Sequence, residues 1–176
     1  SGQGRPTLSW VCRSISELQD SAETRLGDLK FLACGIGPGG FTSLRIGMSI
    51  MKAMGQALGI PLVGVNRLEA AAMGRAILSP SPSAKFLVRL PAAQNLEYMA
   101  IYRVDSGKLP VSLRPPAALP PDRISKLRIP KDAICVTASP DLFYHGIPRV
   151  AHLKACAGQI ESAESLVPLY LRGATL

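Results

Sequence analysis

Several residue types that mark particular protein classes are scarce in this chain of 176 residues. Aromatic residues make up only 5% of it, histidine occurs twice, and its four cysteines form no C-x-x-C pair. No apolar run approaches the roughly 20 residues of a membrane helix, and the N-terminus lacks the apolar stretch of a signal peptide. We therefore expect a cytoplasmic protein with free thiols, without a zinc site or a disulfide framework.

A recognisable catalytic constellation is also missing. His145 and His152 have no obvious Ser or Cys partner, and the carboxylates form no pair arranged for acid–base chemistry. Glu97 and Asp105 fall in a predicted strand and a predicted turn. We therefore expect no catalytic residues, no metal ion, no cofactor and no enzymatic activity of the chain alone.

The composition is that of a globular protein with an excess of positive charge. Hydrophobic residues make up 47% of the chain, which is enough for one core or two small lobes. The net charge is +8, and the basic residues concentrate in a proline-rich stretch. Its members are Arg114, Arg123, Lys126, Arg128 and Lys131. The lack of aromatic residues among them favours a solvated surface, while a tRNA-facing role stays open.

A glycine-dense turn between a predicted strand and a predicted helix is the most informative segment. Its residues are Gly37, Pro38, Gly39, Gly40, Phe41, Thr42, Ser43, Leu44, Arg45, Ile46 and Gly47. The turn matches neither G-x-G-x-x-G nor a phosphate loop that closes on Lys-Ser or Lys-Thr. Thr42 or Ser43 can cap the helix, whose free N–H groups would then suit an anion. A corner where the backbone packs closely is the other interpretation.

Hydrophobic periodicity predicts alternating helices and strands. We expect helices at residues 7–19, 44–58 and 66–78, the last with Asn66 as N-cap and Glu69 as its capping-box partner. Strands are predicted at residues 31–34, 62–65, 86–90, 98–103, 111–114, 133–137 and 168–172. A first lobe would span residues 1–80 and a second lobe residues 81–176.

The predicted helix at 44–58 is apolar on more than one face. Gly47 and Gly55 each cost about 1 kcal/mol of helix stability relative to alanine, and such glycines allow another helix to approach closely. Burial within its own lobe is one explanation of the pattern. The other is a face that packs on a partner protein, for which flexible methionines are well suited.

Read as a whole, the run from Gly37 to Gly47 resembles the G-P-G-S-F-T-G-L-R-I-G element of the TsaB (YeaZ) family. The resemblance continues through Lys52, Ala53 and residues 60–65, and returns at 168–172. Gly40 and Ser43 depart from the family pattern. The family's opening strand with its Asp-Thr pair has no counterpart, and only Ala93 and Glu97-Tyr98 match around residues 91–98.

This resemblance implies the two-lobed actin-like ATPase (ASKHA) fold, an α/β fold with mixed sheets flanked by helices, here with a truncated N-terminal lobe. It implies a non-catalytic subunit that pairs with the transferase TsaD, joined by the ATPase TsaE, to make threonylcarbamoyladenosine in tRNA. Contact with tRNA would be indirect, and a homodimer would form through the same helices when TsaD is absent. The implied interface residues are Leu8, Val11, Ile15, Met48, Met51, Lys52 and Gly55. A nucleotide-binding enzyme of the same superfamily, an RNA-binding module and a degenerate homologue with another partner stay open.

Overall fold

The computed structural model describes residues 8–171 and divides the chain into two compact units, residues 1–30 and 31–176. Most helices and strands of the two units match elements that the periodicity predicts, and the mixed α/β class is confirmed. The predicted lobe boundary at residue 80 stays a prediction. Among the described residues, no helix is both long and apolar enough to cross a membrane.

The first unit consists of the helix α1 (Leu8–Ala22) and a 3-10 turn, η1 (Leu26–Asp28). The predicted helix at 7–19 is confirmed for its described residues and continues to Ala22, while Thr7 lies outside them. Val11, Ile15 and Leu18 recur at three- and four-residue spacing and therefore share one face of α1.

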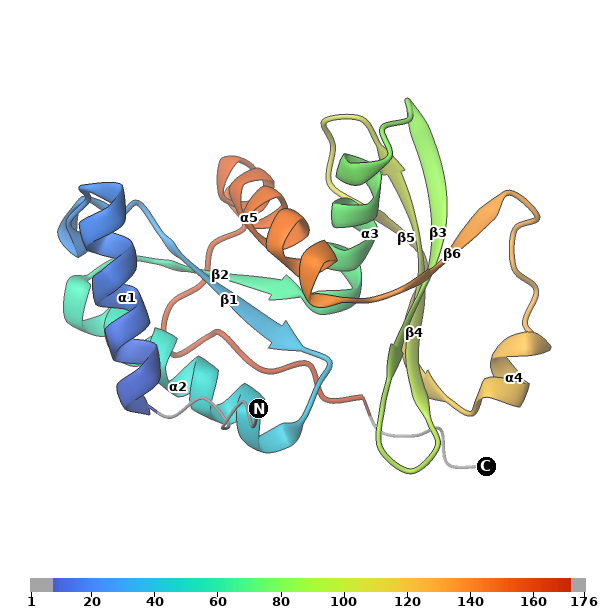
Figure 1. Cartoon of the computed structure of the whole chain (residues 1–176), viewed down its shortest axis with the longest axis horizontal. Helices are drawn as coiled ribbons and strands as arrows, with labels where there is room; N and C mark the ends of the chain where they lie inside the picture. Colours follow the sequence, from blue (N-terminus) through green and yellow to red (C-terminus); the bar gives the residue numbers. More distant parts are fainter. Residues whose placement is uncertain (1–7, 172–176) are drawn as a thin grey trace. The chain divides into compact units, whose positions relative to one another are not determined.

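In the second unit, two parallel strands are joined by a helix. β1 (Leu32–Gly37) pairs with β2 (Leu62–Asn66), and α2 (Phe41–Leu58) connects them (Figure 1). The side chains of β2 alternate: Val63 and Val65 join the main core, while Leu62 contacts Gly55 of α2. β2 is therefore buried on both faces, as parallel strands usually are.

A four-stranded sheet forms the other half of this unit, in the order β5-β4-β3-β6. The antiparallel strands are β3 (Ser83–Pro91), β4 (Glu97–Asp105) and β5 (Val111–Leu119). β6 (Ala133–Thr137) runs parallel to β3, and the short helix α4 (Pro121–Ser125) precedes it. β4 and β5 form a hairpin across the turn at residues 106 and 107. β5 continues five residues beyond its predicted end, through two prolines, which an edge strand tolerates because one of its sides needs no N–H donors.

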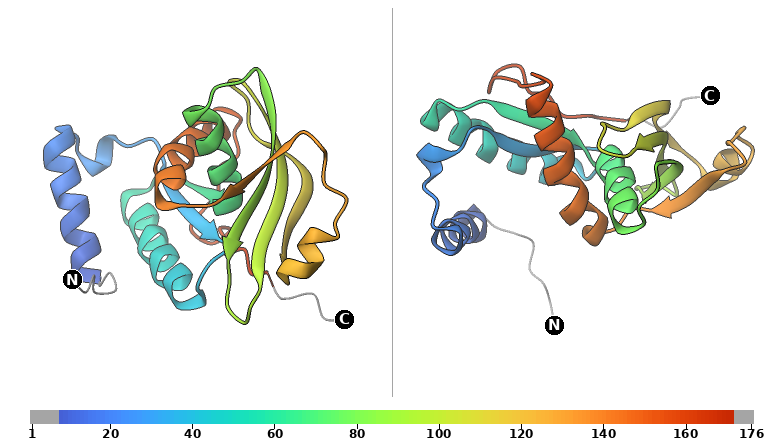
Figure 2. Two further views of the ribbon diagram at one scale, coloured as in Figure 1. Left: turned by 45° about the vertical axis from the view of Figure 1, so that its right-hand side comes forward. Right: turned by 90° about the horizontal axis from the view of Figure 1, so that it is seen from above.

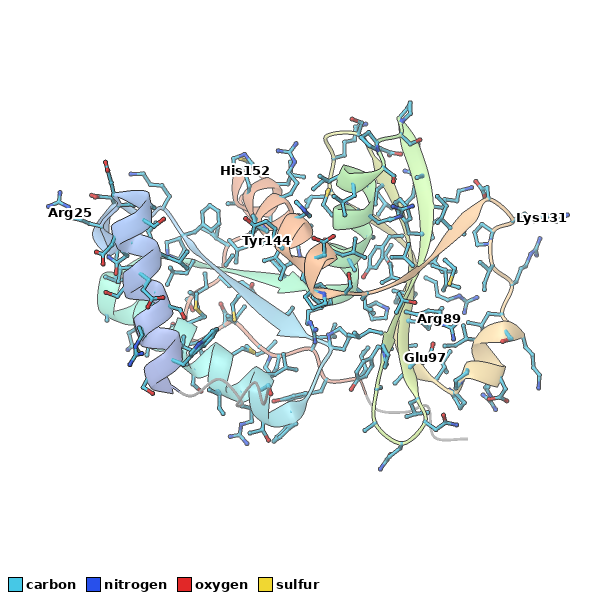
Figure 3. All side chains as sticks on the ribbon, viewed as in Figure 1. Arg25, Arg89, Glu97, Lys131, Tyr144 and His152 are labelled. Atoms are coloured by element: carbon cyan, nitrogen blue, oxygen red, sulfur yellow. The ribbon has the colours of Figure 1, made fainter. Side chains whose placement is uncertain are left out.

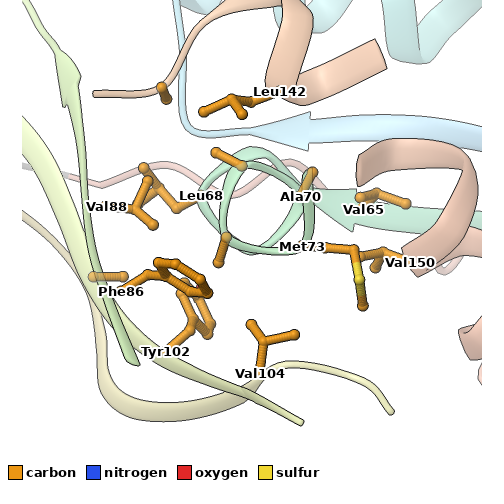
Figure 4. Packing of buried hydrophobic residues seen from close by; sticks show 14 of the residues in the cluster. Val65, Leu68, Ala70, Met73, Phe86, Val88, Tyr102, Val104, Leu142 and Val150 are labelled. Atoms are coloured by element: carbon orange, nitrogen blue, oxygen red, sulfur yellow. The ribbon is translucent and has the colours of Figure 1, made fainter. Parts of the chain in front are cut away.

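The main core lies where two helices cross beside the sheets. α3 (Arg67–Leu78) and α5 (Pro140–Cys156) are in close contact, with Met73, Phe86 and Val150 buried around them (Figure 4). A side-chain carbon at Gly74 would collide with the backbone of Leu142, and one at Gly146 with the carbonyl of Ala70. Glycine at both positions is therefore what permits this approach. The hydrophobic periodicity of the sequence predicts no helix at α5.

Two local predictions around α3 and the C-terminus require correction. Asn66 does cap α3, because its side chain accepts from the Leu68 N–H at 2.8 Å. Glu69, however, is not a capping-box partner: its carboxylate pairs with the Lys154 ammonium at 2.8 Å, since α5 brings that charge alongside. The predicted strand at 168–172 is wrong for residues 168–171, which form no ladder, although the Leu169 N–H donates to the Ile36 carbonyl. Arg172 lies outside the described residues.

Candidate functional site

The glycine loop turns the chain sharply from β1 into α2. Gly37 has a φ of 108°, which favours glycine, and the Gly37–Pro38 peptide bond is cis. Pro38 is fully buried, and α2 begins at Phe41, with Gly40 as its N-cap. The cap predicted at Thr42 or Ser43 is therefore wrong, because the helix begins before both residues. Gly40 brings no capping side chain.

At Gly37 and Gly39 the space in front of the loop is filled by the chain itself. The Arg67 guanidinium Nη1 lies 2.8 Å from the point where a side-chain carbon at Gly39 would sit. A side-chain carbon at Gly37 would lie 3.0 Å from the Leu44 side chain and 3.1 Å from the Leu169 carbonyl oxygen. These contacts make the loop a close-packed corner.

Arg67 contacts the glycine loop, although no feature of the sequence singled it out. Its Nη1 donates to the Pro38 carbonyl at 3.2 Å, and its guanidinium carbon lies 4.4 Å from the centre of the Phe143 ring. Burial lowers the pKa of Arg67 below its usual value. The three groups come from α3, the glycine loop and α5, so no local pattern in the sequence pointed to their meeting.

A cavity of about 710 Å³ opens beside the loop. Loop residues 39–41 and Arg67 line one part of it, and residues 90–93, Tyr98 and residues 169–171 line the rest. Phe41 and Tyr170 approach each other here, with ring centres 5.2 Å apart. Polar and aromatic groups thus meet in one place, which is where the alternative of a nucleotide ligand would have to be tested.

Glu97 and Asp105, the two carboxylates considered in the sequence, both contact side chains within the four-stranded sheet. Arg89 and Glu97 form a bidentate ion pair across β3 and β4, at 2.5 and 2.9 Å (Figure 3). Asp105 ends β4 and accepts from the Ser83 hydroxyl at 2.7 Å. Glu97 therefore begins β4, and Asp105, predicted in a turn, is the last residue of the strand before that turn.

The predicted loop motif lies where the sequence places it, with Phe41, Thr42, Leu44, Arg45 and Gly47 in the first two turns of α2. Side chains on this helix divide between two faces. Leu44, Met48 and Gly55 are buried, while an exposed face, here called the outer face of α2, points away from them. Its residues are Thr42, Arg45, Ile46, Ser49, Ala53 and Gln56.

The predicted interface set is therefore wrong for Met48 and Gly55. Met48 is only 4% exposed, and a side-chain carbon at Gly55 would lie 2.9 Å from Leu62 Cδ2. Both residues pack inside the unit because they share the inward face of α2 with Leu44. Met51 and Lys52 are half-buried. The other three predicted residues belong to α1 in the first unit: Val11 and Ile15 are half-buried, and the side chain of Leu8 is outside the described ones.

The histidines lie on α5, each within reach of a side chain one turn away. His152 Nε2 is 3.6 Å from Cys156 Sγ, a contact that the sequence analysis did not expect, and His145 Nε2 is 3.8 Å from an Asp141 oxygen. Across residues 8–171, no three His, Cys, Asp or Glu side chains are grouped so that they could hold a metal ion.

Cys34 is the one buried cysteine of the described chain, at 4% exposure. Burial, with a smaller effect of the Glu161 carboxylate, raises its pKa to about 11, against an opposing effect of Lys52. The unfolded thiol ionises at lower pH, so the folded state binds more protons between pH 9 and 11. The free energy of unfolding should therefore fall across this range, by roughly 2 kcal/mol from this group.

Urea denaturation at pH 8, 9, 10 and 11 measures this effect, with Cys34→Ala as the reference because other groups also titrate. The wild-type chain should lose more stability over the range than Cys34→Ala loses. Parallel pH profiles would contradict the assignment.

At pH 8 a thiol reagent should modify Cys12, Cys135 and Cys156 quickly, and Cys34 only after unfolding, because those three are exposed.

Comparisons with known proteins agree with this fold and with the glycine-loop resemblance. The profile of the family described as TsaD, tRNA N6-adenosine threonylcarbamoyltransferase, matches residues 5–132. YeaZ from Pseudomonas aeruginosa superposes with a TM-score of 0.79 at 22% identity, covering 97% of this chain and 92% of that one. At this identity the likeness concerns the fold, and the predicted YeaZ-like ASKHA fold is confirmed.

Curated relatives match shorter stretches. An uncharacterized protein of Mycobacterium tuberculosis is 48% identical over 56 residues, which are 32% of this chain and 26% of that protein. The tRNA threonylcarbamoyladenosine biosynthesis protein TsaB of Escherichia coli is 29% identical over 93 residues, 53% of this chain and 39% of TsaB. The tRNA N6-adenosine threonylcarbamoyltransferase of Thermodesulfovibrio yellowstonii is 35% identical over 65 residues, 37% of this chain and 20% of the enzyme. The aligned stretches thus span about a fifth to two-fifths of these relatives.

Proposed function

The chain belongs to the family described as TsaD, tRNA N6-adenosine threonylcarbamoyltransferase, and we propose that it supports threonylcarbamoyladenosine synthesis in tRNA as a non-catalytic subunit. It pairs with a TsaD-type transferase, which performs the transfer. The similarity to E. coli TsaB over 53% of the chain supports this assignment, since that relative is named as a biosynthesis protein for the same modification.

The glycine loop organises the helix that makes the contact. Arg67 and Leu44 occupy the space in which a phosphate cradle would need room, which favours a structural corner. The hydrogen bond from Arg67 to the Pro38 carbonyl and the burial of Pro38 fix the backbone just before α2. The start and direction of α2 are therefore set by packing within the unit.

The observation that carries the proposal is the outer face of α2. It presents small side chains and Ile46, which is 47% exposed, with Arg45 as its one charged residue. Small residues let another backbone approach closely, and an exposed isoleucine gains free energy when a partner covers it. The same face would support a homodimer when the partner is absent, and a TsaE-type ATPase would join the pair. The complex would act in the cytoplasm.

Reconstitution of the reaction tests the non-catalytic role. The TsaD-type and TsaE-type proteins of the same organism would be incubated with tRNA, ATP and the threonylcarbamoyl donor, with and without this chain. We expect modification of tRNA only when the chain and the TsaD-type subunit are both present, measured by mass spectrometry of nucleosides. Modification by this chain without the TsaD-type subunit would contradict the proposal.

A further inference from the structure

Four exposed cations follow one another along α4 and the segment that joins it to β6. Arg123, Lys126, Arg128 and Lys131 are all exposed, and they are here called the basic segment. None of the four has an ion pair or a hydrogen bond through its side chain with another described residue. Among residues 120–131 Asp122 is the one carboxylate, and Asp132 just beyond is held by Lys85 at 2.8 Å. The segment therefore presents a local excess of positive charge.

The apolar residues between these cations hold the segment against the sheet. Ile124 is only 2% exposed and packs with Leu87, Met99 and Ile101 on the face of the sheet opposite the main core. Leu127 and Ile129 pack against the same cluster. Backbone hydrogen bonds from Lys126 to Arg123 and from Leu127 to Ile124 add further constraint. The positive charges are thus carried on an anchored backbone.

From this arrangement we infer that the basic segment binds the phosphate backbone of RNA, and that the tRNA of the modification complex is its partner. The inference rests on the proposed function for the identity of the RNA. A nucleic-acid strand carries a negative charge on every phosphate, so several cations on an anchored backbone can each bind a phosphate of the same strand. The segment contains no aromatic residue on which a base could stack, so the contact is with phosphates and does not depend on RNA sequence.

The orientation of the apolar residues favours RNA over a lipid surface. Membrane-bound amphipathic segments insert exposed apolar side chains below the headgroups. Here Ile124 is buried, and Leu127 and Ile129 pack against the sheet. Figures 1 and 2 show α4 and α2 on opposite sides of the second unit, and Figure 3 shows Lys131 by the loop between α4 and β6. RNA on the basic segment therefore leaves α2 free for a protein partner.

The test compares two variants of the whole chain that lose four cations each. One neutralises the basic segment (R123Q, K126Q, R128Q, K131Q), and the matched control neutralises four exposed cations elsewhere (R13Q, K30Q, K108Q, R149Q). Binding to a fluorescently labelled tRNA transcript would be measured by anisotropy between about 50 and 300 mM KCl. We expect the segment variant to bind at least tenfold more weakly near 100 mM, and its salt slope to shrink by about 0.7–0.9 for each lost phosphate contact. The control should stay within about threefold of wild type.

Other outcomes overturn the inference. Equal losses in both variants would mean that net charge alone attracts RNA. Wild-type binding to vesicles that contain phosphatidylserine, without binding to tRNA, would make the segment a membrane contact. The segment variant should still co-elute with the TsaD-type subunit. If wild type pairs with that subunit but does not bind tRNA, this inference alone fails; if it binds tRNA as described but does not pair, the proposed function fails.

Discussion

Gly146→Ala should lower the free energy of unfolding by roughly 3 kcal/mol or more, because the added methyl group has no room at the crossing of α3 and α5. It would collide with the Ala70 carbonyl, and its next neighbours are also backbone atoms of α3. Backbone cannot rotate aside as a flexible side chain can. The helices would have to separate, and that would loosen the packing of Leu142, Met73 and Val150 in the main core.

The matched control is Gly47→Ala in α2, where an added carbon meets nothing within 4 Å. The helix preference of alanine over glycine should then raise stability by about 1 kcal/mol. Urea unfolding followed by circular dichroism measures both variants. A Gly146→Ala protein within about 1 kcal/mol of wild type would show that the two helices do not approach as closely as described.

Ile46→Glu should weaken binding to the TsaD-type subunit by at least about a hundredfold, because it puts a carboxylate in place of the large apolar side chain of the outer face of α2. A charge buried in an interface without a partner costs several kcal/mol. Because Ile46 is 47% exposed in the chain, the substitution should change the free energy of unfolding by only about 0.5 kcal/mol. Isothermal titration calorimetry measures the affinity, and urea unfolding confirms that the variant folds.

Ile77→Glu is the matched control, since Ile77 is another exposed isoleucine, at 40% exposure, but lies on α3. It should bind the TsaD-type subunit as wild type does. Equal weakening by both variants would remove the outer face of α2 as the contact site. Gly55→Asp is unsuitable as a test of pairing, because Gly55 packs against Leu62 and the substitution would disturb the chain itself.

Local patterns allowed much of the fold to be predicted. The end of α2 at Leu58 follows from Gly59, whose φ of 66° forms the left-handed C-cap. The parallel strand β2 follows from a short apolar run, and the cap of α3 from Asn66. Each of these signals lies within a few residues of the element that it specifies, which is why the sequence alone was sufficient.

The features that could not be predicted depend on contacts between distant segments. Gly146 and Pro148, taken locally, argue against a continuous helix. The helix α5 nevertheless forms, because Gly146 fits against α3 and the Ser139 side chain caps α5 by accepting from the Leu142 N–H. Glu69 has the spacing of a capping-box partner, yet Lys154, 85 residues away, pairs with it. At the candidate site, the glycine loop was visible in the sequence, whereas the contact of Arg67 with Phe143 was not.

Which face of α2 is available to a partner was likewise not settled by the pattern. Apolar residues surround much of this helix, and only the packing of β1 and β2 separates the buried Met48 from the exposed Ile46. A buried helix and a partner-binding helix therefore gave the same sequence pattern. The structure shows that one face of α2 packs within the unit and that the other is exposed.

Size-exclusion chromatography with light scattering tests the central proposal most directly, on the chain alone and mixed with the TsaD-type subunit of the same organism. We expect the mixture to elute as one species with the mass of a one-to-one complex, and we expect Ile46→Glu to abolish this species while Ile77→Glu preserves it. Separate elution of the two wild-type proteins at micromolar concentrations would contradict the pairing on which the proposed function depends.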